Sequence, residues 1–220
     1  AAGKIAMGSG KVFICGGVES MTRVTTGFDP MPYPYTEKEN PNVYFTMGTT
    51  AENVAKQYSI SRTEQQEFAI SSHHKAFDAQ SKGNFNNEIV PIGNCSQDSN
   101  IRPNSNQEKL DSLKLAFDPN GTVTAATSSP LTDGAAATLI CEEQYAKDNN
   151  LEILGRIVST AVQGCKPDTM GLGPIGASQK ALERAKLSIK DINIVELNEA
   201  FASQSLACIK DLQIDQNKVN

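Results

Sequence analysis

An amide and a carboxylate stand side by side in VELNEAFASQ, residues 195–204, where an apolar run gives way to a helical pattern. An amide held at the carboxyl end of a strand faces the crevice where α/β sheets bind ligands, and it can position a water molecule or polarise a carbonyl group. A structural role also suits these residues. Asn198 would be a favourable N-cap, and Glu199 in the first turn would complement the helix dipole. The local sequence leaves both interpretations open.

The cysteines add little catalytic capacity. They are odd in number and widely spaced, without a C-x-x-C pair, so neither a disulfide framework nor a zinc site is predicted. Such usage is typical of a reducing compartment, and we expect the cytoplasm. Cys15, Cys141 and Cys208 fall on apolar strands or helix faces and are expected to be buried and unreactive, whereas Cys165 lies in a loop beside Lys166.

The two histidines, His73 and His74, are adjacent in a predicted helix. Successive helical residues point about 100° apart, so at most one of them can face a pocket, and we expect a solvated helix face. No spacing of histidines and cysteines suits a metal ion, and no metal site is predicted.

Composition and charge argue against two classes of partner. The chain has 220 residues, of which 39% are hydrophobic and 20% charged, and it can bury a core without disulfides or metals. No apolar run approaches the roughly 20 residues of a membrane span. The net charge is −5 and the basic residues are scattered, so no binding surface for nucleic acid is predicted.

Two features precede the first long helices. Residues 11–17 are an apolar run closed by paired glycines, which predicts a buried strand. Residues 25–44 carry four prolines, and the residues before prolines disfavour helix, so this stretch is predicted to be an irregular surface insertion.

Helical spacing of apolar residues predicts one helix over 49–58 and a second from Ser61 to Gly83. Ser61 and Glu64 fit a capping box at the start of the second helix. Gly83 suits the left-handed position after its end.

Strands and helices alternate along the rest of the chain. The predicted strands cover 88–92, 122–126, 135–143, 156–164 and 192–197. The predicted helices cover 143–149, 175–187 and 199–212. This alternation predicts a layered α/β architecture.

Five motifs occur in one order along the chain, and together they resemble the thiolase family, enzymes that form and cleave thioesters of 3-ketoacyl-CoA. They are GGVESMT (16–22), MGTTAENVA (47–55), GTVTAATSSPLTDGAAA (121–137), MGLGPIGAS (170–178) and NEAFA (198–202). The resemblance covers essentially all 220 residues. TSSPLTDG and GCKPDTMGLGP look more like the degradative 3-ketoacyl-CoA thiolases of fatty-acid oxidation than the branch that forms acetoacetyl-CoA.

The resemblance implies a fold with two copies of a core, in five layers α/β/α/β/α, and an inserted loop domain that covers the CoA. Residues 1–24 with 121–150 would end the first half, 25–120 would be the loop domain, and 151–220 would start the second half. The fold would be incomplete in this chain.

The resemblance also implies a two-step acyl transfer. A cysteine thiolate attacks the 3-keto carbonyl, acetyl-CoA leaves, and a second CoA resolves the acyl-enzyme, helped by a base and two oxyanion holes. The family's nucleophilic cysteine should fall a few residues upstream of Ala1, and its Gly-His-Pro histidine and acid/base cysteine beyond Asn220. We therefore expect this chain to be the central portion of a thiolase, and to be inactive alone.

Six residues match family positions that contact substrate. Asn198 would hold the water of the first oxyanion hole. Ser129 would bind the pantetheine of CoA, and Lys114, in place of the family arginine, a CoA phosphate or the adenine side. The acyl and thioester region would be lined by Phe201, Met170 and Met47. Coenzyme A is then a substrate, no cofactor or metal is needed, and the partner is a second copy in a homodimer or homotetramer.

Three functions are weighed. The first is an acyltransferase of the thiolase type, cleaving 3-ketoacyl-CoA with CoA or running the reverse condensation. The second is a non-catalytic thiolase-like module that binds acyl-CoA. The third, a related condensing enzyme, is disfavoured by the NEAFA and MGLGP motifs.

Overall fold

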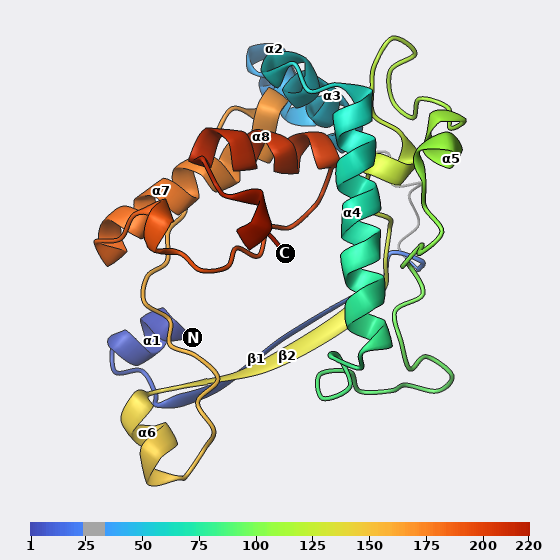
Figure 1. Ribbon diagram of the computed structural model, residues 1–220. Coiled ribbons are helices and arrows are strands. Elements are labelled where there is room, and N and C mark those ends of the chain that lie inside the picture. The colour runs from blue at the N-terminus through green and yellow to red at the C-terminus, as the bar shows by residue number, and fades with distance from the viewer. Residues whose placement is uncertain (24–33) are drawn as a thin grey trace. The chain divides into compact units, whose positions relative to one another are not determined.

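The computed structural model describes residues 1–23 and 34–220 (Figure 1). The chain divides into two compact units. One comprises Ala1–Met31 and Leu131–Thr160, and the other comprises Pro32–Pro130 and Ala161–Asn220. The first part of the proline-rich stretch predicted at 25–44 lies outside the described residues. From Pro34 it forms two short helices, α2 (Pro34–Glu39) and the 3₁₀ helix η1 (Pro41–Tyr44).

The first unit is built on an antiparallel pair of strands, β1 (Val12–Glu19) and β2 (Gly134–Cys141) (Figure 1). Their register runs from Val12 opposite Cys141 to Glu19 opposite Gly134. The bounds of both strands confirm predicted ones within two residues, but the predicted burial of the first strand is wrong, because most of β1 is exposed, including Ile14 and Val18. The helices α1 (Ala2–Ala6) and α6 (Glu143–Asp148) complete this unit, α6 as predicted.

Two of the sequence motifs meet at the end of this ribbon. The Asp133 carboxylate accepts hydrogen bonds from the Thr22 backbone N–H (2.9 Å) and from Ser20 Oγ (3.2 Å). These bonds hold the pKa of Asp133 below its usual value. GGVESMT is thereby tied to TSSPLTDG.

The second unit is helical. Its longer helices are α3 (Met47–Tyr58), α4 (Arg62–Ser81), α7 (Gly173–Ala185) and α8 (Ala202–Leu212), and α5 (Gln107–Asp111) is short. The 3₁₀ helices are η2 (Ala125–Thr127), η3 (Pro167–Leu172), η4 (Ile189–Asp191) and η5 (Gln216–Lys218). No helix among the described residues is long and apolar enough to cross a bilayer.

The helix α4 begins as predicted. Ser61 Oγ accepts from the Glu64 N–H (3.2 Å), and the Glu64 carboxylate accepts from the Ser61 N–H (2.7 Å), which completes the capping box. Gly83, with φ +73°, takes the left-handed conformation just past the end of the helix.

The core of the second unit forms around α8, which contacts α3, α4 and α7 (Figure 1). One cluster packs Cys208, Ile209 and Leu212 of α8 with Ile175 of α7. A second joins Ala207 of α8 to residues Val54 and Ile60. Eight of the eleven residues of α8 are buried, which makes α8 the centre of this unit.

The start of α8 differs from the prediction. The helix begins at Ala202 with Phe201 at its N-cap and no side-chain cap, so the expected N-cap role of Asn198 and first-turn role of Glu199 are wrong. Glu199, Ala200 and Phe201 bond to other segments instead of continuing the helical turn. Local propensity could not anticipate these partners.

Four of the predicted strands are absent from the described part of the chain. The segments 88–92, 122–126, 156–164 and 192–197 contain at most isolated bridges, such as Leu115 with Thr124 and Val195 with Val219. A strand needs a continuous hydrogen-bonded neighbour as well as an apolar, β-branched sequence. The sequence pattern reports the second condition only.

Candidate active site

A pocket of the second unit brings together two of the predicted site residues, Asn198 and Ser129. It is formed by α4, by the segment around η2 and by the turn before α8. Its lining residues are Phe68, Ala69, Ser72, His73, Ala126, Thr127, Ser128, Ser129, Pro130, Leu197, Asn198, Glu199 and Ala202. Its volume of about 310 Å³ is at the low end for ligand sites, so it suits one arm of a larger ligand.

Helix α4 contributes one face to this pocket. Phe68, Ala69, Ser72 and His73 are spaced three and four residues apart, so they lie on the same side of the helix. The capping box and the fully buried Gln65 and Gln66 of α4 fix the beginning of this helix. The pocket therefore has one wall on a regular helix whose first turns are fixed by these contacts.

Ser129 is positioned by the segment that precedes it. Thr124 and Thr127 are buried and close a tight turn, in which the Thr124 N–H donates to Thr127 Oγ1 (3.0 Å). Ser128 then pairs with Phe201 as an antiparallel bridge, and the Ser129 N–H donates to the Ala200 carbonyl (3.0 Å). The Ser129 side chain is exposed, and its hydroxyl bonds to nothing within the described part of the chain.

Asn198 is likewise exposed in the pocket, and its amide makes no hydrogen bond to any residue that the structure describes. Its neighbour Glu199 is anchored, because Ser72 Oγ donates to Glu199 Oε2 at 2.6 Å. The pocket thus presents a free amide and a free hydroxyl, held by backbone and side-chain contacts of the adjacent residues.

His73 lies in this pocket, contrary to the expectation of a solvated face, while His74 is exposed. The Nδ1 atom of His73 accepts a hydrogen bond from the Arg102 backbone N–H (3.2 Å). Burial is the main cause of a lowered His73 pKa, and the positive charge of Arg102 adds to it against the opposing effect of Glu199. Burial therefore favours the neutral form of His73, and the bond from Arg102 makes Nδ1 the acceptor nitrogen.

Phe201 and Met47 do not line this pocket, although Phe201 is next in sequence to the lining residue Ala202. The rings of Phe117 and Phe201 pack edge to face with centroids 6.0 Å apart. Phe117 in turn covers Gly48, where a Cβ atom would lie 2.1 Å from the ring. Met47, which precedes Gly48, is half exposed at the first position of α3.

Met170 and Lys114 are exposed and do not line the pocket. Met170 belongs to η3, which is tied to α3 by the bond from Asn53 Nδ2 to the Asp168 carbonyl (2.9 Å). Lys114 follows a turn held by Arg62.

In that turn one guanidinium nitrogen of Arg62 donates to three backbone carbonyls, at 2.8 to 3.0 Å. They belong to Leu110, Asp111 and Leu113.

Of the thirteen lining residues only Asn198 and Ser129 were predicted as site residues, and the unpredicted ones include Ser72, His73 and the anchoring Glu199. The signal available for the first two was their helical spacing from Phe68 and Ala69, which puts polar and apolar side chains on one face. Glu199 could not be paired with Ser72 from sequence, because 127 positions separate them.

The five cysteines differ in exposure. Cys208 is fully buried, and burial raises the pKa of its thiol. Cys15 and Cys141 are half-buried, while Cys95 and Cys165 are exposed. No cysteine lines the pocket, and the described residues hold no group of three metal-ligating side chains.

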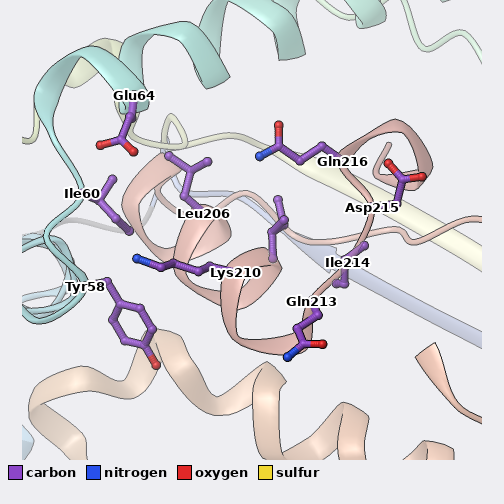
Figure 2. A pocket seen from close by; sticks show the side chains of 10 residues that line it. Tyr58, Ile60, Glu64, Leu206, Lys210, Gln213, Ile214, Asp215 and Gln216 are labelled. Carbon is purple, nitrogen blue, oxygen red and sulfur yellow. The ribbon is translucent and has the colours of Figure 1, made fainter. Parts of the chain in front are cut away.

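A second pocket lies at the other end of α8 (Figure 2). Its apolar lining includes Ile60, Leu206 and Ile214, and its charged lining residues include Glu64 and Lys210. Tyr58, which also lines it, has its hydroxyl 3.3 Å from Asp211 Oδ2. None of the predicted site residues belongs to this pocket.

Comparison with known proteins gives the family. A family model described as "Thiolase, N-terminal domain" matches residues 1–144, and one described as "Thiolase, C-terminal domain" matches residues 151–220. The chain belongs to the thiolase family. The motif-based resemblance is thereby confirmed along nearly the whole chain.

Curated members of the thiolase family align with the whole chain. The 3-ketoacyl-CoA thiolase of Marinobacter nauticus is 46% identical over 235 residues, which cover 100% of this chain and 60% of that protein. The 3-ketoacyl-CoA thiolase of Photobacterium profundum is 46% identical over 98% of this chain and 59% of its own length. The chain thus spans about 60% of the length of these thiolases.

Solved thiolase structures share the fold. The dimeric peroxisomal thiolase of Saccharomyces cerevisiae superposes with a TM-score of 0.95 at 40% identity, over 99% of this chain and 58% of that one. Human mitochondrial 3-ketoacyl-CoA thiolase superposes with a TM-score of 0.87 at 36% identity, over 99% of this chain and 60% of that one. The predicted α/β thiolase fold, incomplete in this chain, is confirmed.

Proposed function

We propose that the protein containing this chain is a 3-ketoacyl-CoA thiolase, which cleaves 3-ketoacyl-CoA with CoA to acetyl-CoA and a shortened acyl-CoA, or catalyses the reverse condensation. The observation that carries the proposal is the pocket that both Asn198 and Ser129 line, with a side-chain amide and a hydroxyl that make no hydrogen bond to the described residues. The names of the relatives and of the solved structures support the same reaction.

Asn198 acts as the catalytic residue of this set. Its amide positions a water molecule, or donates directly, where negative charge develops on the carbonyl oxygen. Donors placed in advance at such a position typically contribute about 10²–10³ in rate.

The other predicted residues bind substrate. Ser129 hydrogen-bonds the pantetheine of CoA from its place across the pocket, and Lys114 meets a phosphate or the adenine side. Phe201 and Met170 line the site of the acyl chain, and Met47 lines the region of the thioester. The apolar packing of Phe117 between Gly48 and Phe201 supports a common acyl surface for Met47 and Phe201.

The attacking thiolate is not among the five cysteines of the chain. Cys208 is buried with a raised pKa, and none of the others lines the pocket. We expect these 220 residues alone to be inactive in thiolysis. Residues 25–120 would be the loop domain, between a first half of 1–24 with 121–150 and a second half of 151–220.

The remaining expectations follow the family. Coenzyme A is a substrate, no cofactor or metal takes part, and the protein pairs with a second copy as a homodimer or homotetramer in the cytoplasm. The dimeric yeast structure supports the pairing.

The alternative is a non-catalytic module that binds acyl-CoA, favoured by a pocket with free polar groups and no cysteine. One experiment separates the two. The full-length gene product is mixed with acetoacetyl-CoA and CoA, cleavage is followed by the loss of enolate absorbance, and CoA binding is measured by calorimetry. CoA binding together with cleavage supports the thiolase, and CoA binding without cleavage supports the non-catalytic module. A protein that shows neither CoA binding nor cleavage would overturn both candidate functions.

A further inference from the structure

Backbone hydrogen bonds leave a short gap around Asn198. On one side the Val195 N–H donates to the Lys218 carbonyl (2.7 Å), and the Asn220 N–H donates to the Val195 carbonyl (2.9 Å). On the other side the Ala200 carbonyl accepts from the Ser129 N–H (3.0 Å). Residues 196–199 between these points are not part of a regular helix or strand.

Side chains bridge this gap at two places. Glu196 accepts from Asn220 Nδ2 (2.8 Å) at an exposed position. Glu199 accepts from Ser72 Oγ (2.6 Å) at a partly buried position inside the pocket. The second contact is adjacent to Asn198, and its length is that of a charge-assisted bond to a carboxylate, the stronger kind of hydrogen bond.

The donor stands on a regular support. Ser72 is in the middle of α4, a helix of 20 residues whose first turn is capped and whose Gln65 and Gln66 are fully buried. Helix α4 also contacts α8 directly. A hydrogen bond from such an element can fix the position of an irregular segment.

We propose that the hydrogen bond between Ser72 and Glu199 holds the Asn198 amide at the place where the substrate carbonyl reacts. Ser72 and Glu199 are then positioning residues, and neither needs to touch the substrate. This inference rests on the proposed function, since it assigns a cause to the placement of the proposed catalytic amide.

The physical consequence is a loss of rate with little loss of binding. A displacement of about 1 Å of a catalytic group can cost on the order of 10² in rate. The Ser129 hydroxyl belongs to a segment held by the tight turn at Thr124 and Thr127 and by the backbone bond from the Ser129 N–H to the Ala200 carbonyl, and neither contact involves the Glu199 side chain. Contacts to CoA at Ser129 should therefore survive when the bond at Glu199 is lost.

The test uses the full-length gene product and four variants, Ser72→Ala, Glu199→Ala, the double variant, and Glu199→Gln. Gln keeps an oxygen that can accept from Ser72, so it is the conservative rescue. The matched control is Tyr58→Phe, which removes the hydroxyl of Tyr58 (Figure 2). This hydroxyl also lies near a carboxylate, 3.3 Å from Asp211 Oδ2, close to the C-terminal end of α8. Steady-state kcat and KM are measured for thiolysis of acetoacetyl-CoA, with thermal unfolding as a check on folding.

Each single alanine variant should lower kcat about 10- to 100-fold with KM changed less than about threefold. The double variant should lose no more of its kcat than either single variant does, because both substitutions break the same bond. Glu199→Gln should recover most of the rate, and Tyr58→Phe should match the wild type.

Wild-type kcat in folded Ser72→Ala and Glu199→Ala variants would overturn the inference while leaving the proposed thiolase activity intact. Equal losses in Glu199→Gln and Glu199→Ala, or additive losses in the double variant, would also overturn it. A wild-type protein that does not cleave acetoacetyl-CoA would instead overturn the proposed function itself, and the inference with it.

Discussion

The carboxylate of Glu52 accepts hydrogen bonds from the backbone N–H groups of both Thr122 (2.9 Å) and Val123 (2.9 Å). Glu52 and its neighbour Asn53 lie in the MGTTAENVA motif, and Asn53 holds the Asp168 carbonyl. One turn of α3 therefore fixes the segment that leads to Ser129 and the segment that leads to Met170. The two polar residues of this motif have a structural explanation in these contacts.

Replacing Glu52 with Ala should lower the free energy of unfolding by about 2 kcal/mol, since hydrogen bonds to a charged group contribute roughly 1.5–3 kcal/mol. Gly121→Ala should cost about 1–3 kcal/mol, because its Cβ would lie 2.2 Å from Glu52 Oε1. In the double variant the clash is gone, so the two losses should not add. Urea denaturation measures all three.

Controls for this cycle are Glu67→Ala, an exposed position on α4, and Gly155→Ala, where a Cβ would meet nothing within 4 Å. Both should stay within about 0.5 kcal/mol of the wild type. Strictly additive losses at positions 52 and 121 would contradict the packing of Gly121 against Glu52.

Ser61→Ala should destabilise the protein by about 1 kcal/mol, because it removes the N-cap acceptor of α4. Thr63→Ala, an exposed neighbour in the same turn, is the control and should have a smaller effect. The bonds from Ser61 also lower the pKa of Glu64, so this stabilisation should be lost as the pH falls through the folded-state pKa. Chemical denaturation at pH 7 and at pH 4 tests both statements.

The stability of the wild type should fall on acidification below about pH 6.5 in part because of His73. Its folded-state pKa is lowered by burial, by Arg102 and by His74, against the opposing charges of Glu199 and Asp98. Between the folded and unfolded pKa values the unfolded chain binds more protons, so the free energy of unfolding rises with pH. His73→Gln should reduce this slope.

His74→Gln, at the exposed neighbouring position, should keep the wild-type slope. The measurement is the urea midpoint between pH 5 and pH 7.5. An unchanged slope in His73→Gln would contradict a neutral, half-buried His73.

Iodoacetamide should label Cys95 and Cys165 of the native protein well before Cys208. The first two are exposed, whereas Cys208 is fully buried and burial raises the pKa of its thiol. Only the thiolate reacts, so both effects slow alkylation. Peptide mass spectrometry after timed labelling gives the order, and labelling in guanidinium shows that all sites are reactive when unfolded. Native labelling of Cys208 at the rate of Cys95 would be inconsistent with this core.

Local signals in the sequence were sufficient for helix α4, because its cap, apolar spacing and terminal glycine all act within a few residues. They also predicted the bounds of β1 and β2, which pair with each other. They failed at residues 192–197 and at Asn198, where the outcome depends on which distant segment pairs with an extended chain. The local sequence around Asn198 fits an N-cap as well as an irregular segment before the helix, so it could not show that α8 begins only at Ala202.

In the candidate site, too, local motifs predicted some residues, while others depend on distant packing. The motifs led to Asn198 and Ser129, and the structure puts them in one pocket. Ser72, His73 and the anchoring role of Glu199 depend on the packing of α4 against the turn before α8, which no local pattern reports. The catalytic and binding roles of the six predicted residues stay predictions.

The measurement that tests the central claim most directly is the kcat of Asn198→Ala in the full-length gene product, for cleavage of acetoacetyl-CoA by CoA. Asn193→Ala, an exposed asparagine five residues earlier, is the control. A fall in kcat of about 10²–10³ with CoA affinity near that of the wild type, and no change in the control, is the predicted result. Unchanged turnover in Asn198→Ala would contradict the placement of the catalytic amide in this pocket.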